Sequence, residues 1–361
     1  MTHRIINFSA GPAVLPLEVL EEAQRDLVDY KGAGLSVMEM SHRSPHYDAI
    51  HQGAIASLRS LVGIGEDYAV LFLQGGASLQ FSMVPMNLMH PARKADYVLT
   101  GPWSQKALKE AVKEGGARAA GSSEGTGFDR IPAASDLDLD GEADYVHFTS
   151  NNTIVGTQWR SEPEAGDVPL VADMSSDILS RPIDVARYGL IYAGAQKNLG
   201  PAGVTLVIVR KDLLERAPES LPTMLAYRTH AAKSSLYNTP PCWSIYVVGL
   251  ACQWLERQGG LEAMARRNAE KAARLYDLID AGDFYRGTAQ VASRSLMNVP
   301  FRLPSEELES RFLETAKEAD MTNLKGHRSV GGIRASIYNA MPLESVDRLV
   351  ELMREFERTH G

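Results

Sequence analysis

Short apolar runs without polar alternation, separated by amphipathic stretches, are the feature that most constrains the fold of this 361-residue sequence. Such runs occupy 68–74 (YAVLFLQ), 95–101 (ADYVLTG), 143–150 (ADYVHFTS), 168–176 (VPLVADMSS), and 190–195 with 204–210 (LIYAGA, VTLVIVR). This composition is typical of strands buried on both faces, and helical connections between such strands favour a mostly parallel sheet. The first two thirds of the chain are therefore predicted to form an α/β domain.

The final third of the sequence shows a different pattern. A long amphipathic stretch at 261–282 ends at a glycine, and strand-like segments then alternate with helix-like segments up to the C-terminus. We therefore expect a smaller α+β domain made of residues 1–15 and 255–361, in addition to a large domain of residues 16–254.

Charge and composition exclude several classes of protein. The chain is mildly acidic, with 37 Lys and Arg against 45 Asp and Glu, whereas nucleic-acid-binding proteins usually carry a basic face. The N-terminal segment lacks the apolar core of a signal peptide, and no run approaches the roughly 18 apolar residues of a membrane helix. The two cysteines, Cys242 and Cys252, fall in one predicted helix and form no disulfide framework. We expect a cytoplasmic protein without nucleic-acid or membrane partners.

The residues at the ends of the predicted strands form a chemically coherent set. Ligands of parallel α/β sheets bind beyond the carboxyl ends of the strands. Lys197 and Asp173 follow two of these strands, and Thr153 follows a third. Trp103 and the run Gly75–Ser78 lie at the starts of predicted helices, and a helix N-terminus favours a phosphate. Each signal alone also has a structural explanation, such as a tight turn, a core tryptophan or a helix cap.

Pyridoxal phosphate is one ligand that uses every member of this set. It needs an amine for a Schiff base, a carboxylate against its pyridine nitrogen, an aromatic ring to stack on and a cradle for its phosphate. The short separation between Asp173 and Lys197 allows their strands to be neighbours. The sequence therefore predicts a pyridoxal phosphate site in which Lys197 supplies the amine.

A second set of residues is basic. His-Arg pairs occur at 42–43 and 327–328, and Arg334 follows the second pair. Arginine has a planar fork that suits carboxylates and phosphates, so we expect these residues to bind an anionic substrate. A metal is not predicted, because a proline interrupts the helical spacing of the three neighbouring histidines and no carboxylate or cysteine completes a site. Those histidines are His42, His46 and His51.

Five longer motifs carry a resemblance to a known family. They are NFSAGPAVLP (7–16), SHRS (41–44), GAQKNLGPAG (194–203), YNTPP (237–241) and GHRSVGGIRASIYNAMP (326–342). Together they resemble the phosphoserine aminotransferases, a family of class-V, fold-type I enzymes that depend on pyridoxal phosphate. The resemblance implies a homodimer with shared active sites. It also implies reversible transamination between L-glutamate and 3-phosphohydroxypyruvate, giving O-phospho-L-serine and 2-oxoglutarate in serine biosynthesis. Family members commonly also serve pyridoxine biosynthesis with 4-phosphohydroxy-L-threonine.

The same resemblance implies roles for individual residues. The Schiff-base lysine corresponds to Lys197, the partner of the pyridine nitrogen to Asp173, and the stacking ring to Trp103. Further cofactor contacts are implied for Gly76, Ala77, Thr153 and Gln196, and for Asn238 and Thr239 reaching the cofactor phosphate from the neighbouring subunit. Substrate contacts are implied for Ser9, His42, Arg43, His327, Arg328 and Arg334.

Two departures from the family pattern leave the fine specificity open. Pro45-His46-Tyr47 stands where a more charged segment is expected, and Asn152 stands where some relatives have an acid. Other fold-type I enzymes remain as alternatives, either an alanine–glyoxylate-type aminotransferase or a cysteine desulfurase. A non-catalytic regulator that binds pyridoxal phosphate is a further alternative. Regulators of this fold carry an added DNA-binding domain, for which the motif that begins at Asn7 is expected to leave no room.

Overall fold

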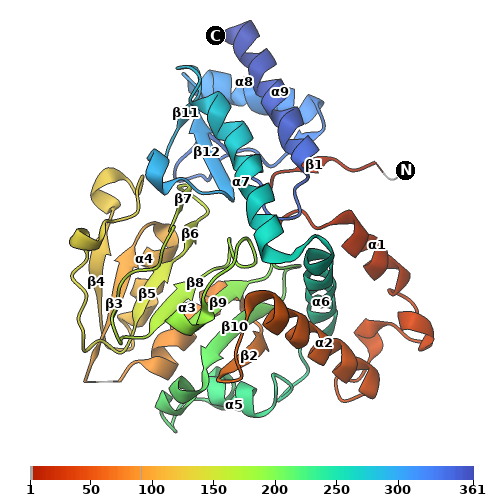
Figure 1. Ribbon diagram of the computed structural model, residues 1–361, viewed down its shortest axis with the longest axis vertical. Coiled ribbons are helices and arrows are strands. Elements are labelled where there is room, and N and C mark those ends of the chain that lie inside the picture. Colours follow the sequence, from red (N-terminus) through yellow and green to blue (C-terminus); the bar gives the residue numbers. More distant parts are fainter. Residues whose placement is uncertain (1–2, 91) are drawn as a thin grey trace.

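The fold is built around one large sheet, and the computed structural model describes it for residues 3–90 and 92–361 (Figure 1). Its seven strands lie in the order β2-β10-β9-β8-β5-β3-β4. β10 runs antiparallel to its neighbours β2 and β9, and the other neighbouring pairs are parallel. The predicted α/β fold with a mostly parallel sheet is therefore confirmed. The strands are β2 (Tyr68–Leu73), β3 (Lys94–Leu99), β4 (Gly116–Ser122), β5 (Val146–Thr149), β8 (Leu170–Asp173), β9 (Tyr188–Gly194) and β10 (Thr205–Arg210).

Helices cover both faces of this sheet, which explains why its strands lack polar alternation (Figure 1). One face packs against α2 and α6, and the opposite face packs against α3, α4 and α5. In β8, Leu170 and Ala172 belong to the first core and Val171 to the second, so successive side chains are all buried. These helices are α2 (Pro45–Val62), α3 (Gly76–Leu88), α4 (Pro102–Ala111), α5 (Tyr227–Ala232) and α6 (Cys242–Arg257).

A separate core lies in the C-terminal part of the chain, drawn in blue at the top of Figure 1. Its three-stranded antiparallel sheet has the order β11-β12-β14 and packs against α7, α8 and α9. A short strand near the N-terminus, β1, pairs in parallel with β13 and adds Ile6 and Phe8 to this core. The elements are β1 (Ile6–Asn7), α7 (Gly260–Ile279), β11 (Arg286–Gly287), β12 (Asn298–Arg302), α8 (Glu306–Glu318), β13 (Met321–Thr322), β14 (Ile333–Ser336) and α9 (Leu343–His360).

The helix α7 contributes to one core of the large sheet and to the C-terminal core. Its N-terminal half contributes Leu261 and Met264 to the core of the large sheet, and its C-terminal half contributes Ala272 and Leu275 to the C-terminal core. The predicted domain boundary near residue 255 therefore remains a prediction. The remaining elements are α1 (Leu17–Arg25) and the hairpin β6 (Asn151–Asn152) and β7 (Thr157–Gln158).

The edge strand β4 was not predicted from the sequence. Its residues, GARAAGS, are mostly alanine and glycine, which have low strand propensity. It forms because β3 offers a free edge with which it pairs in parallel. Both cysteines are free and lie in α6, as the sequence predicted. Within the described ranges, none of the helices has the length and apolar character required to cross a membrane.

Candidate active site

A cavity of about 310 Å³ lies at the carboxyl ends of β5, β8 and β9. Thr149 ends β5, Asp173 ends β8, and Lys197 lies three residues beyond the end of β9. The structure therefore places Asp173 and Lys197 at the ends of neighbouring strands, as the sequence predicted, and their ligand-binding roles stay predictions. The cavity brings together the predicted residues Gly76, Ala77, Trp103, Thr153, Asp173, Gln196, Lys197, His327 and Arg334.

Lys197 is the only lysine that lines this cavity among the described residues. Its Nζ donates a hydrogen bond of 2.8 Å to the Oγ1 of Thr153 and lies 5.6 Å from the centroid of the Trp103 ring. Desolvation lowers the pKa of Lys197 to about 8, although the charge of Asp173 opposes this shift. The positive charge of Arg334 lowers the pKa further. An amine with such a pKa has a substantial neutral fraction near physiological pH and can act as a nucleophile or base.

Asp173 is a buried carboxylate in the floor of the cavity, with an exposed fraction of 5%. It lies between Thr149 of β5 and Tyr192 of β9 in the sheet, so the strands of Asp173 and Lys197 are neighbours, as the sequence predicted. Its Oδ1 accepts a hydrogen bond of 2.9 Å from the backbone N–H of Ser175. Burial raises the pKa of Asp173, and the nearby Lys197 ammonium opposes that rise. The carboxylate is therefore suited to hold a cationic N–H group of a ligand.

The start of α3 lines one end of the cavity, and its backbone suits an anion. Gly75 and Gly76 have φ values of 88° and 65°, a left-handed conformation that glycine adopts without strain. A Cβ atom at Gly75 would lie 2.6 Å from Leu79, so a larger residue does not fit there. The N–H groups of the first turn of this 13-residue helix have no partners within the helix, and its dipole favours a phosphate.

The indole of Trp103 enters the cavity from the first turn of α4. The Oγ of Ser104 accepts hydrogen bonds from the N–H groups of Thr100 and Gly101, at 3.0 and 3.2 Å, and thereby fixes the turn that precedes the indole. The Nε1 atom of Trp103 is buried without a hydrogen-bond partner. The Oγ1 of Thr149 and the Nε of Arg334 are also buried and unpartnered, and both residues line the same cavity. Such groups are normally satisfied, so their presence fits a cavity that holds a polar ligand.

A buried polar network joins the cavity to the C-terminal core. The Nδ2 of Asn151, which lines the cavity, donates to the Oγ of Ser176 and the Oδ1 of Asn298, both at 2.8 Å. The Nδ2 of Asn298 donates in turn to the hydroxyl of Tyr338 at 3.1 Å, and that hydroxyl donates to the carbonyl oxygen of Ala10 at 2.8 Å. The network thereby holds Ala10, Asn151 and Ser176 in the cavity wall.

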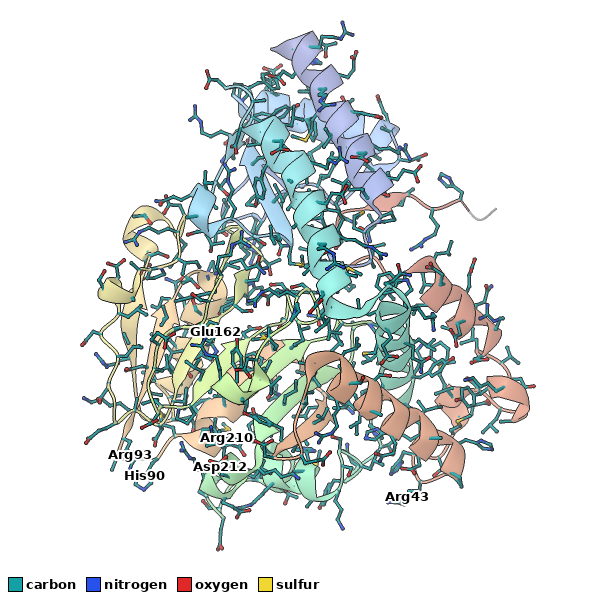
Figure 2. The ribbon with its side chains drawn as sticks, viewed as in Figure 1. Arg43, His90, Arg93, Glu162, Arg210 and Asp212 are labelled. Atoms are coloured by element: carbon teal, nitrogen blue, oxygen red, sulfur yellow. The ribbon has the colours of Figure 1, made fainter. Side chains whose placement is uncertain are left out.

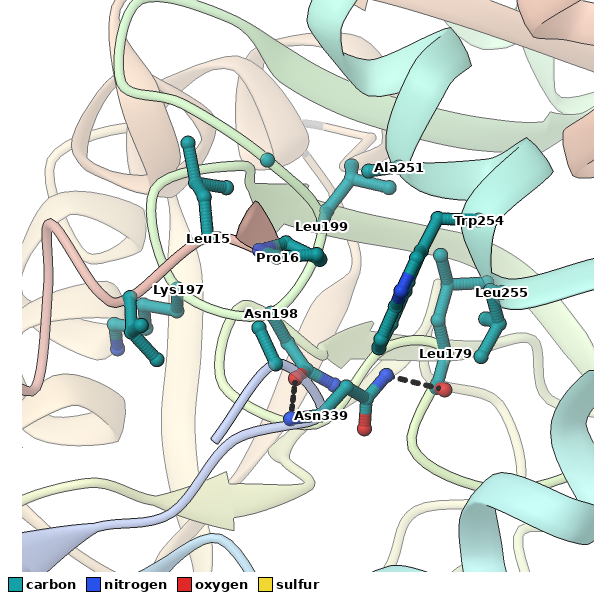
Figure 3. Close-up of a pocket in the computed structure, with 13 residues that line it drawn as sticks. Leu15, Pro16, Leu179, Lys197, Asn198, Leu199, Ala251, Trp254, Leu255 and Asn339 are labelled. Carbon is teal, nitrogen blue, oxygen red and sulfur yellow. Dashed lines mark hydrogen bonds between the residues drawn. The ribbon is translucent and has the colours of Figure 1, made fainter. Parts of the chain in front are cut away.

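The loop that carries Lys197 is also fixed from behind (Figure 3). The Oδ1 of Asn198 accepts a hydrogen bond of 2.9 Å from the backbone N–H of Asn339. The side chain of Asn339 donates to the carbonyl oxygen of Leu179 at 2.8 Å. These bonds connect the lysine loop to the segment after β14 and to the turn after β8, which restricts the position of the amine.

Some predicted site residues lie outside this cavity. His42 and Thr239 contact each other instead, at 3.2 Å between Nδ1 and Oγ1. Asn238 lines a separate pocket next to β2, and Arg43 is exposed at the edge of the molecule (Figure 2). Ser9 and Arg328 lie next to the cavity-lining residues Ala10 and His327 but do not line the cavity themselves. In a single chain, the cavity of Lys197 is therefore not lined by His42, Arg43, Asn238 or Thr239.

The two departures from the expected motif pattern lie outside the cavity lining. Asn152 is buried, and its Nδ2 donates to the Oγ1 atoms of Thr100 and Thr157 at 3.0 and 3.1 Å. Pro45 is the first residue of α2, after the N-cap Ser44, a position at which proline favours helix initiation. Asn152 and Pro45 therefore have structural roles.

Several lining residues were missed by the sequence analysis. Thr149 is the sheet neighbour of Asp173, and its position at the end of a strand was a usable signal. The other missed residues are on turns whose contribution to the cavity depends on tertiary structure. They are Ala10, Gly11, Ile154, Ser175 and Ser176.

The amine, carboxylate, indole and helix N-terminus fit the pyridoxal phosphate predicted from the sequence. Comparisons with known proteins support this cofactor. The Aminotransferase class-V family matches residues 5–349 of the chain. The chain is 59% identical to the phosphoserine aminotransferase of Desulfosudis oleivorans, over 100% of each sequence.

Solved structures give the same result. The phosphoserine aminotransferase from Bacillus circulans subsp. alkalophilus matches with a TM-score of 0.98 and 53% identity, over 100% of each chain. A PLP-bound phosphoserine aminotransferase from Trichomonas vaginalis matches with a TM-score of 0.94 and 38% identity, over 97% of this chain and 100% of that one. On the family match and these full-length similarities, the chain belongs to the class-V aminotransferases.

Proposed function

We propose that this class-V aminotransferase is a phosphoserine aminotransferase, which transfers an amino group between L-glutamate and 3-phosphohydroxypyruvate to form O-phospho-L-serine and 2-oxoglutarate. The observation that carries the proposal is the location of Lys197, Asp173, His327 and Arg334 around one cavity. The full-length similarity to enzymes of that name supports it. The reaction belongs to serine biosynthesis, and 4-phosphohydroxy-L-threonine of pyridoxine biosynthesis is a second candidate substrate.

The cavity residues would hold pyridoxal phosphate in defined ways. Lys197 would bind it covalently, Asp173 would accept a hydrogen bond from its ring nitrogen, Trp103 would stack on its ring, and the first turn of α3 would bind its phosphate. When bound, the cofactor withdraws electrons from the α-carbon of the amino acid and makes that carbon acidic. The solved relative from Trichomonas vaginalis, described as PLP-bound, supports this assignment.

The protein must then move one proton and hold one substrate. The lowered pKa of Lys197 allows its neutral amine to take the proton from the α-carbon and to return it. The Oγ1 of Thr153 holds the Nζ of Lys197 in place. The guanidinium of Arg334 is anchored to the backbone oxygen of Thr153 at 3.4 Å, so it is placed to bind an anionic group of the substrate near the amine.

The residues that lie outside the cavity point to a shared site. We propose a homodimer in which His42, Arg43, Asn238 and Thr239 act in the cavity of the neighbouring subunit. The His42–Thr239 contact places two of them in one surface cluster. Large apolar side chains are exposed near these residues. Met38, with 59% exposure, and Tyr237, with 47%, are close to them in sequence. Met224, with 42% exposure, lines the same pocket as Asn238. Such side chains are common at subunit interfaces.

The cellular location and domain division are also part of the proposal. The two free cysteines are compatible with a reducing cytoplasm. The large unit of residues 16–254 would carry the cofactor, and the smaller unit of residues 1–15 and 255–361 would contribute His327, Arg328 and Arg334 to substrate binding.

A spectral titration of the purified holoenzyme tests the function. Glutamate should change the absorption of the bound cofactor, and 3-phosphohydroxypyruvate should restore the original spectrum. Restoration by glyoxylate alone would indicate an alanine–glyoxylate-type enzyme. A bound cofactor whose spectrum does not respond to glutamate would indicate a binding protein without turnover. The oligomeric state follows from light scattering, and a monomeric active enzyme would contradict the shared site.

A further inference from the structure

The exposed lysine Lys106 lies beside the indole that lines the active-site cavity. It is located in the second turn of α4, one turn after Trp103, and its Nζ is 4.4 Å from the centroid of the Trp103 ring. The Nζ of Lys197 is 5.6 Å from the centroid of the same ring. A cation over an aromatic face is attracted by the ring, so this contact holds the ammonium group next to the cavity wall.

Lys106 also belongs to a cluster of positive groups around the same cavity. Partial burial lowers the pKa of His327, and the charges of Arg334, Arg328 and Lys106 lower it further. These groups come from two distant parts of the chain, α4 and the segment from 327 to 334. His327, Arg334 and Trp103 line one cavity, and Lys106 lies against the Trp103 ring, so Lys106 and the two cavity residues flank the same space.

The cations of this cluster lack acidic partners. In residues 3–90 and 92–361, no carboxylate oxygen lies within the 4.0 Å of an ion pair from Lys106, Arg328 or Arg334. Lys113, immediately beyond α4, contrasts with them because its Nζ lies 2.6 Å from Glu110. Unpaired positive charges that lie close together repel one another, and an anionic ligand would relieve this repulsion.

We propose that Lys106 is a further substrate-binding residue, whose ammonium group contacts the phosphate of the keto acid and favours phosphorylated over unphosphorylated substrates. The inference rests on the proposed function and deepens it. A phosphate monoester carries a charge of about −1.5 to −2 near neutral pH and has three acceptor oxygens. Lysine binds such a group as a point charge and needs no fixed bidentate geometry. This suits a flexible side chain at the rim of the cavity.

The proposal differs from a purely structural role for Lys106. If the lysine only supports Trp103, its removal should weaken cofactor binding and affect every substrate equally. If it contacts phosphate, its removal should affect phosphorylated ligands selectively, and arginine should restore much of the loss. A loss confined to phosphorylated ligands, with recovery when arginine replaces the lysine, therefore distinguishes phosphate binding from support of Trp103.

Two measurements on the holoenzyme test the proposal, with K106Q, K106R and the control K109Q. Lys109 is an exposed lysine of the same helix, outside the cavity lining. The first measurement is kcat/KM for 3-phosphohydroxypyruvate and for hydroxypyruvate. We expect K106Q to lower the preference for the phosphorylated substrate roughly tenfold through KM, the size expected for a lost charged hydrogen bond. K106R and K109Q should keep the preference near that of the unchanged protein.

The second measurement does not depend on turnover. The dissociation constant of 3-phosphoglycerate, which lacks a keto group, is determined by calorimetric titration at several salt concentrations, with glycerate as the unphosphorylated control. K106Q should bind 3-phosphoglycerate more weakly and with a smaller salt dependence. Equal losses for phosphorylated and unphosphorylated ligands would overturn the proposal. If the unchanged enzyme itself shows no preference for 3-phosphohydroxypyruvate, the proposed function has failed instead.

Discussion

Lys197 and Thr153 are joined by a hydrogen bond of 2.8 Å between Nζ and Oγ1, across 44 residues of sequence. Thr153 follows the hairpin strand β6, and its backbone oxygen also accepts a hydrogen bond from Arg334. One threonine therefore contacts both the amine and the guanidinium that the proposed reaction requires. This residue couples the position of the lysine to the position of the substrate-binding arginine.

Replacing Thr153 with valine should lower kcat while the fold is kept. Valine has nearly the same shape but cannot accept the hydrogen bond from Nζ, so the amine loses one fixed contact. A typical hydrogen bond contributes about 1 kcal/mol, which corresponds to a roughly fivefold loss in kcat. Thr153→Ser retains the hydroxyl and is the matched control. Steady-state kinetics on both variants checks the prediction, and equal activities would contradict it.

Replacing Lys197 with alanine should abolish transamination without abolishing cofactor binding. The other proposed contacts, Asp173, Trp103 and the start of α3, are unchanged in this variant. Absorption after gel filtration measures the retained cofactor, and single-turnover assays with glutamate measure the reaction. Full transamination by Lys197→Ala would remove the basis of the proposed mechanism.

The pH dependence of stability should contain a contribution from Lys271 in α7. This lysine is 2% exposed, and its Nζ donates to the backbone oxygens of Ile337, Tyr338 and Met341. Burial lowers its pKa from 10.5 to about 7. Between these values the unfolded chain binds the proton and the folded chain does not, so this group makes the folded state more stable as the pH rises.

Urea unfolding of the unchanged protein and of Lys271→Met, at pH 7 and pH 9.5, measures this contribution. Methionine has a similar length and no charge, but it removes the N–H donors of the amine from these buried carbonyl oxygens, so the variant should be less stable at both pH values. The difference in unfolding free energy between the two proteins should be larger at pH 9.5. A difference that stays constant or shrinks would contradict the assigned shift.

Replacing Gly332 with alanine should disturb the loop that carries His327. Gly332 has a φ of +70°, and a Cβ there would lie 2.5 Å from the Cδ of Arg302 and 2.8 Å from the carbonyl oxygen of Phe301. We expect a loss of about 1–3 kcal/mol in stability and a higher KM for the keto acid. Gly53→Ala is the control, because this glycine lies in α2 with no atom within 4 Å of an added Cβ. That change should stabilise the helix by about 0.5–1 kcal/mol. Thermal unfolding of Gly332→Ala, Gly53→Ala and the unchanged protein measures both changes in stability.

The sequence predicted the part of the site that depends on local pattern. Asp173, Lys197 and Trp103 each follow a buried strand, and the topology of parallel sheets brings strand ends together. Long-range packing was not predictable in the same way. The bond between Asn151 and Asn298 joins residues that are 147 positions apart, and neither residue has a local pattern that indicates the other. The reversed direction of β10 likewise depends on the neighbours β2 and β9 and not on its own sequence.

The positions of the proposed substrate-binding residues likewise could not be predicted from local sequence patterns. The His-Arg pairs suggested an anion site, but the motif at 42–43 lies outside the cavity of its own chain, whereas His327 and Arg334 line it. Lys106 has no distinctive motif, and only the folding of α4 brings it against the Trp103 ring beside the cavity. Residues whose role depends on a second element, or on a second chain, are therefore the ones that a single sequence leaves undefined.

The parallel pairing of β1 with β13 has a consequence for biosynthesis of the enzyme on the ribosome. Ile6 and Asn7 pair with Met321 and Thr322, and the segment that follows β1 places Ala10 and Gly11 in the cavity wall. The segment of β1 therefore cannot take its final place until β13, much later in the chain, has been synthesised. A nascent chain carries Lys197 before this wall exists, so the cavity is completed only after β13 has been synthesised. A prematurely terminated chain that lacks β13 cannot assemble it.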